Sequence, residues 1–165
     1  YLNEDDELFS DNDERAIFFA KGIVETVKKL KWAPDIVHVS GWLASLVPLY
    51  IKEFYKNDPL FANSKIVTSV YNKSFKGGLD KEKLIEKIKF DQLSDEKLQE
   101  LESISSDAML KIAMDNSDAV IIGSETLNDE LQKYVSSLNV PILGFQAPEN
   151  ISEAYSGFYL NTLLK

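Results

Sequence analysis

The chain has 165 residues, 44% of them hydrophobic, which is enough to fill the core of one domain of ordinary size. Its 27 acidic and 18 basic residues give a net charge of −9, which argues against nucleic acid and anionic membranes as partners. There is no cysteine, and no apolar run approaches the ~20 residues that span a bilayer, so disulfides and thiolate metal sites are excluded and a cytoplasmic location is favoured.

The start of the chain is strongly acidic. We expect residues 1–10 to form a flexible arm in front of a single domain, within a chain of 1–165. Asp11 and Glu14 have the spacing of an acidic helix start. Because the chain begins at Tyr1 rather than at Met, we also expect it to be a piece of a longer polypeptide.

Short runs of β-branched residues alternate with longer stretches of helical periodicity. The runs predict strands at 35–40, 65–70, 118–122 and 140–145. The periodic stretches predict helices at 13–30, 42–56 and 124–138, two or more helices within 80–116 of which the last begins at about Ser106, and a helix after Asn150. We expect Pro48 to kink the second helix, Ser124 to cap the fourth, and residues 71–79 to form a polar turn.

This alternation predicts an α/β fold, in which an open parallel sheet of Rossmann-like type forms the middle of three layers. Ligands bind such sheets beyond the carboxyl ends of the strands, and the first strand ends in His38, Ser40, Gly41 and Trp42. His38 is the single histidine, and it either contacts a substrate or is a structural residue with satisfied hydrogen bonds. Trp42 either stacks on a sugar or anchors the core. No catalytic residue and no metal site can be assigned from the pattern.

Four segments, in order along the chain, carry a family resemblance. Asp11-Asn12-Asp13-Glu14-Arg15 with Phe18-Phe19, followed by W-x-P-D-I-V-H-x-x-x-W-x-x-x-L-V-P-L-Y from Trp32 to Tyr50, resembles bacterial glycogen synthases and plant starch synthases. The stretch from Thr68 to Gly77 is similar to the family's T-I-H-N turn. Further matches lie at Ser117-Asp118-Ala119-Val120 with Gly123-Ser124, and at Pro141-Ile142-Leu143-Gly144.

The resemblance implies a retaining glucosyltransferase of the two-domain GT-B type, which transfers glucose from ADP-glucose to the end of an α-1,4-glucan. This chain would be part of its N-terminal, acceptor-side domain. Its partners would be a glucan or maltooligosaccharide and the nucleotide-sugar, with no further cofactor. By the resemblance, Asp11 and Asn72 would hydrogen-bond the sugar. Trp42 would pack or stack on the sugar, and His38 would help to position it. Arg15 would support the wall of the sugar cleft.

The sequence departs from the family at three positions. The family reads H-x-H-D-W, where this chain has Ser40 and Gly41, and Tyr71 replaces the histidine that precedes Asn72. Lost imidazoles lower transition-state stabilisation, and by the resemblance the donor-binding domain would begin only after about residue 150, so we expect this chain alone to be inactive. The alternative is a non-catalytic glucan-binding or partner-binding module derived from the same fold. In that reading the last helix presents Tyr155, Phe158 and Tyr159 for self-association, whereas otherwise it packs on its own sheet.

Overall fold

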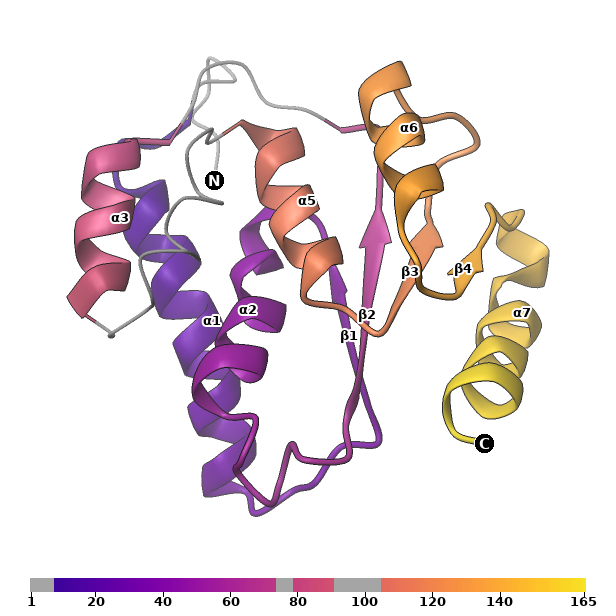
Figure 1. Ribbon diagram of the computed structural model, residues 1–165, viewed down its shortest axis with the longest axis horizontal. Helices are drawn as coiled ribbons and strands as arrows, with labels where there is room; N and C mark the ends of the chain where they lie inside the picture. Colours follow the sequence, from indigo (N-terminus) through magenta and orange to yellow (C-terminus); the bar gives the residue numbers. More distant parts are fainter. Residues whose placement is uncertain (1–7, 74–78, 91–104) are drawn as a thin grey trace.

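The described residues form a four-stranded, all-parallel sheet flanked by helices on both faces. The computed structural model describes residues 8–73, 79–90 and 105–165. The strands follow the order of the sequence, β1-β2-β3-β4, and span Ile36–Ser40, Lys65–Val70, Ala119–Ile122 and Ile142–Leu143. Val39 pairs with Thr68, and Thr68 in turn with Val120. The predicted three-layer α/β fold is confirmed (Figure 1).

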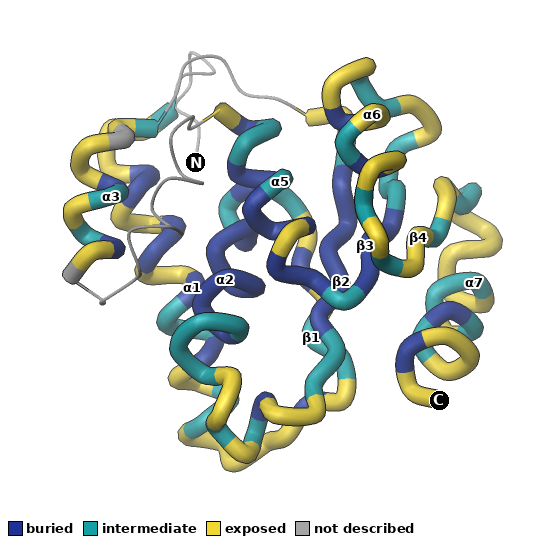
Figure 2. The backbone as a smooth tube through the Cα atoms, viewed as in Figure 1, coloured by how far each residue is buried: buried dark blue, intermediate teal, exposed yellow. Residues whose placement is uncertain are grey.

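One face of the sheet carries most of the helices and the larger part of the core. They are α1 (Asn12–Lys29), η1 (Trp42–Ala44), α2 (Leu46–Phe54), α3 (Lys81–Phe90), α5 (Ser106–Asp115) and α6 (Asp129–Ser137). Val39 and Ile66 pack there with Leu46 and Met109, while Val120 packs with Leu131 of α6. Figure 2 shows β2, β3 and the inner sides of α1 and α5 as buried. The helices on this face therefore hold the sheet from one side through apolar packing.

The opposite face is covered by the end of the chain. Helix α7 (Ile151–Phe158) follows the short turn η2 (Pro148–Asn150) and continues into the π-turn η3 (Tyr159–Leu163). Phe158 and Leu163 are buried against Val67, Ala119 and Ile121. The aromatic face of the last helix thus packs on its own sheet, as one of the two sequence interpretations had it, and self-association stays a prediction.

Two local predictions were wrong for physical reasons. The helix expected at 42–56 is broken at Ser45 into η1 and α2, so Pro48 lies in the first turn of α2, where its missing N–H needs no acceptor, and it kinks nothing. Ser124 does not cap the fourth helix. Asn128 does, because its side-chain oxygen accepts the Leu131 N–H at 2.8 Å.

Other predictions are confirmed or fall outside the described part of the chain. Helix α1 begins and ends within a residue of the predicted bounds, and β2 matches its prediction. The fourth strand is shorter than expected. Residues 1–7, 74–78 and 91–104 lie outside the description, and with them most of the expected acidic arm, part of the 71–79 turn and the middle of the 80–116 stretch. None of the described helices is both long and apolar enough to cross a membrane.

Candidate functional site

The parallel strands end together at one edge of the sheet, and polar residues follow three of them. Ser40 ends β1, Asn72 lies two residues beyond β2, and Ser124 lies two residues beyond β3. Helix α1 also begins at this end of the molecule, the upper end in Figure 1. Because side chains from separate strands converge only at such an edge, this is where we place the candidate site.

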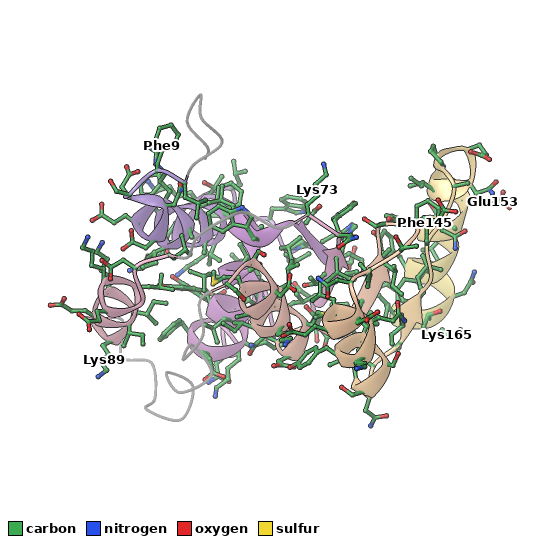
Figure 3. All side chains as sticks on the ribbon, turned by 90° about the horizontal axis from the view of Figure 1, so that it is seen from above. Phe9, Lys73, Lys89, Phe145, Glu153 and Lys165 are labelled. Carbon is green, nitrogen blue, oxygen red and sulfur yellow. The ribbon has the colours of Figure 1, made fainter. Side chains whose placement is uncertain are left out.

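The ends of β2 and β3 are tied to each other at this edge. The Gly123 N–H donates to the Val70 carbonyl at 2.8 Å, and the Asn72 N–H donates to the Ser124 hydroxyl at 2.9 Å. The tie leaves the Asn72 side chain exposed, so its amide is open to solvent. Lys73 follows and extends away from the ribbon (Figure 3). The backbone of Asn72 is therefore fixed by a hydrogen bond, while its side-chain amide faces solvent.

Tyr71 occupies the space above Gly123. A Cβ atom on Gly123 would lie 2.4 to 2.9 Å from three atoms of the Tyr71 ring. Real Cβ contacts are not that short, so a glycine is required for the ring to lie there. Tyr71, which takes the place of a histidine in the resembled family, thus packs its ring against the end of β3.

Gly41 turns the chain sharply out of β1. Its φ of 78° and ψ of 165° lie in a region of backbone space that side chains other than glycine's strain to occupy. The resembled family has an acidic residue at this position. An acidic residue would not favour this backbone conformation. The conformation therefore agrees with a glycine at a position where the resembled family has an aspartate.

Asp11 lies at the exposed start of α1. Its carboxylate makes no capping bond to the helix, and instead accepts a hydrogen bond from the Arg15 Nε at 2.9 Å. This bond lowers the pKa of Asp11. The Arg15 guanidinium also lies 5.0 Å from the centre of the Phe9 ring. Asp11 and Arg15 form an exposed ionic pair at the same end of the molecule as Asn72.

The structure separates Trp42 from His38. Trp42 is 6% exposed and packs in the core with Val39 and Leu46, on the face of the sheet that α1 covers. His38 points to the other face, because neighbouring residues of a strand alternate. There its ring lies 5.8 Å from the Tyr155 ring and 6.0 Å from the Tyr159 ring of the C-terminal helix. The four sequence-predicted residues do not form one cluster, and their joint role in sugar binding stays a prediction.

Both ring nitrogens of His38 have partners. Nε2 lies 2.7 Å from the Ser69 hydroxyl, and Nδ1 lies 2.8 Å from the Tyr159 hydroxyl. Burial of the ring against the last helix lowers the pKa of His38. Burial likewise raises the pKa of Tyr159 to about 12, with the charges of Tyr155 and Tyr71 adding to it. His38 is thus a neutral, satisfied residue at neutral pH.

Sequence reasoning named Tyr71 only as a departure from the family and the helix tyrosines only as a packing or interface surface, and it missed Ser69 and Tyr159 as hydrogen-bond partners of His38. The period of two along Val67, Ser69 and Tyr71 could have placed them on one face. The spacing of four between Tyr155 and Tyr159 could have shown that both meet that face. In residues 8–73, 79–90 and 105–165, no three histidine, aspartate or glutamate side chains lie close enough together to hold a metal ion.

Comparison with known proteins gives consistent matches. The family described as "Starch synthase catalytic domain" matches residues 1–140. A glycogen synthase of Clostridium perfringens is 33% identical over 122 residues, 74% of this chain and 25% of that protein. A glycogen synthase of Vibrio parahaemolyticus is 32% identical over 136 residues, 81% of this chain and 27% of that protein.

A glycogen synthase of Chlorobium luteolum is 32% identical over 131 residues, 79% of this chain and again 25% of the relative. The chain therefore spans about a quarter of the length of the curated relatives that it matches. No solved structure gives a significant match.

Proposed function

Because the chain belongs to the family of starch synthase catalytic domains, we propose that it supplies the acceptor side of a glucosyltransferase that extends an α-1,4-glucan from ADP-glucose. The observation that carries this proposal is the carboxyl edge of the sheet. There Asn72 is fixed by the bond from its backbone to Ser124 while its amide stays exposed. An amide that offers both donors and acceptors suits the neighbouring hydroxyls of a glucose unit.

The other groups at the edge fit an uncharged polyhydroxyl ligand. Ser40 is exposed at the end of β1, and the half-buried Tyr71, whose ring lies over Gly123, precedes Asn72 in the chain. Aromatic rings with a polar tip suit sugars, which have apolar faces and hydroxyl edges. A net charge of −9 does not oppose a neutral glucan, whereas it does oppose a polyanion. The acceptor side is therefore the part of the reaction that this chain supports best.

The activity is tested by incorporation of glucose from ADP-glucose into glycogen by the intact protein. Transfer above the level of a heat-treated control supports the proposal. Maltoheptaose binding without any transfer would leave the alternative, a glucan-binding module. If the intact protein shows no transfer and no binding over a range of conditions, both the proposed activity and the alternative are ruled out.

Asn72→Ala is the matched probe of the edge. We expect it to weaken maltoheptaose binding about fivefold, the worth of about one hydrogen bond. Lys133→Ala, on the exposed side of α6, serves as the control and should leave affinity unchanged. Equal affinity of the Asn72 variant and the wild type would remove Asn72 from the proposal.

A further inference from the structure

A continuous polar chain joins two strands to the last helix. Ser69 is fully buried, and its hydroxyl lies 2.7 Å from His38 Nε2, while the Tyr155 ring lies 5.8 Å from the His38 ring. The second ring nitrogen of His38 bonds the Tyr159 hydroxyl. Tyr155 lies in α7 and Tyr159 is its C-cap, so the two rings come from the same side of one helix, with centroids 6.2 Å apart. We call these four residues the tyrosine clamp.

The clamp is fully satisfied while His38 is neutral. A neutral imidazole has one donor and one acceptor, and each hydroxyl can donate one proton and accept another. If Tyr159 donates to Nδ1, the Nε2 proton goes to Ser69, and the reverse tautomer works equally well. Around the clamp the contact between α7 and the sheet is apolar. Apolar contacts alone permit a helix to slide, whereas a satisfied polar chain fixes its position.

The clamp is continuous with the carboxyl edge. Ser69 pairs in register with Ser40 on one side and with Ile121 on the other. Tyr71 lies two residues beyond Ser69, on the same face of the sheet, with its ring over Gly123. Helix α7 reaches β2 through His38 and Ser69, and Ser69 lies two residues before Tyr71 and three before Asn72. The contact with α7 therefore bears on the same stretch of chain that carries the edge.

We propose that Tyr155 and Tyr159 are positioning residues, which act through His38 and Ser69 to hold the carboxyl edge in the geometry that binds glucan. Neither residue needs to touch the sugar. This inference rests on the proposed function, because a fixed edge matters to binding only if the edge is where glucan binds. By this inference, the last helix helps to maintain the geometry of the acceptor site.

The clamp also predicts an acid sensitivity. Partial burial lowers the pKa of His38 and so favours the neutral ring, and a proton added to the ring makes both nitrogens donors, which forces the Ser69 and Tyr159 hydroxyls to accept from it. A carboxylate near this helix in the described part of the chain is that of Asp35, which lines a hollow with Tyr159. The described groups that contact the His38 ring are the Ser69 hydroxyl and the Tyr155 and Tyr159 rings, and none of them carries a negative charge in acid. Acid therefore loosens the contact of α7 and weakens glucan binding.

The test is titration of the intact protein with maltoheptaose at about pH 7.5 and about pH 5.5, on either side of the ordinary histidine pKa of about 6.5. We expect the dissociation constant of the wild type to rise about threefold to tenfold in acid, and that of Tyr159→Phe to rise about fivefold already at the higher pH. The control is Tyr134→Phe, which removes a phenol that bonds Asp115 on the other face. It should match the wild type at both pH values.

The outcomes separate this inference from the function on which it rests. No binding by the wild type at either pH overturns the proposed function, and this inference with it. Binding by the wild type with unchanged affinity in Tyr159→Phe at both pH values overturns the inference alone. Should that variant not fold, the imidazole NMR signals of His38 decide, since it is the single histidine of the 165 residues. Signals that move when maltoheptaose binds support the clamp, and unmoved signals overturn it.

Discussion

Replacing Gly123 with alanine adds a methyl group that would clash with the ring of Tyr71. The added Cβ would lie 2.4 Å from the nearest ring atom, so either the ring or the end of β3 must move. Overpacking of this kind costs about 1–3 kcal/mol of unfolding free energy. The backbone of Gly123 is not in the left-handed region, so no strain adds to that cost. The clash with Tyr71 is the whole of the expected effect.

A double-mutant cycle isolates the clash. In a Tyr71→Ala background the three ring atoms nearest to the added Cβ are gone, so the same Gly123→Ala change should be neutral or stabilise by about 0.4–1 kcal/mol through the unfolded chain. The matched control is Gly144→Ala at the end of β4, where nothing lies within 4 Å of an added Cβ. Urea unfolding of the four cycle members measures the coupling, expected at about 1–3 kcal/mol. Equal costs of Gly123→Ala with and without the ring would refute the packing described here.

Four further predictions concern individual supports of the fold. Gly41→Asp restores the family's residue but should destabilise by about 1–3 kcal/mol in urea unfolding, because φ is 78° there; an unchanged midpoint would contradict this. Asp118→Ala should cost about 1–3 kcal/mol, since its carboxylate accepts both the Ile66 N–H and the Lys52 ammonium at 2.8 Å; Asp118→Asn keeps an acceptor and should cost less. Asn128→Ala should cost about 1 kcal/mol as the loss of a helix cap, while Ser124→Ala should leave α6 intact, which amide exchange of that helix can report. Stability should fall as the pH drops below 6.5, because the lowered pKa of His38 makes the unfolded chain bind a proton first, and His38→Gln should flatten this part of the profile.

The layered fold could be predicted from the sequence because its signals are local. The β-branched run at 65–70 and the three-to-four spacing of apolar residues in 13–30 each depend only on neighbouring positions, and both elements form as expected. Asn128 was overlooked because Ser124 is an equally good cap by type. The structure gives Ser124 another partner, the Asn72 N–H, from a strand 52 residues away. No local pattern contains that contact.

The candidate site was harder to predict for the same reason. The sequence predicts that His38 lies in a strand, but its partners Ser69 and Tyr159 lie 31 and 121 residues away, so they depend on how the strands and the last helix come together. Trp42 follows the same strand yet enters the core on the other face. Residue type indicated the kind of chemistry, whereas the grouping of the residues required the fold.

The central claim is that glucan binds at the carboxyl edge of the sheet. The most direct measurement is the amide NMR spectrum of the protein during titration with maltoheptaose. We predict that the shifted amides gather at the ends of β1, β2 and β3, around Gly41, Asn72 and Ser124. Shifts confined to the opposite end of the strands, around Trp32 and Lys65, or no shifts at any maltoheptaose concentration, would contradict it.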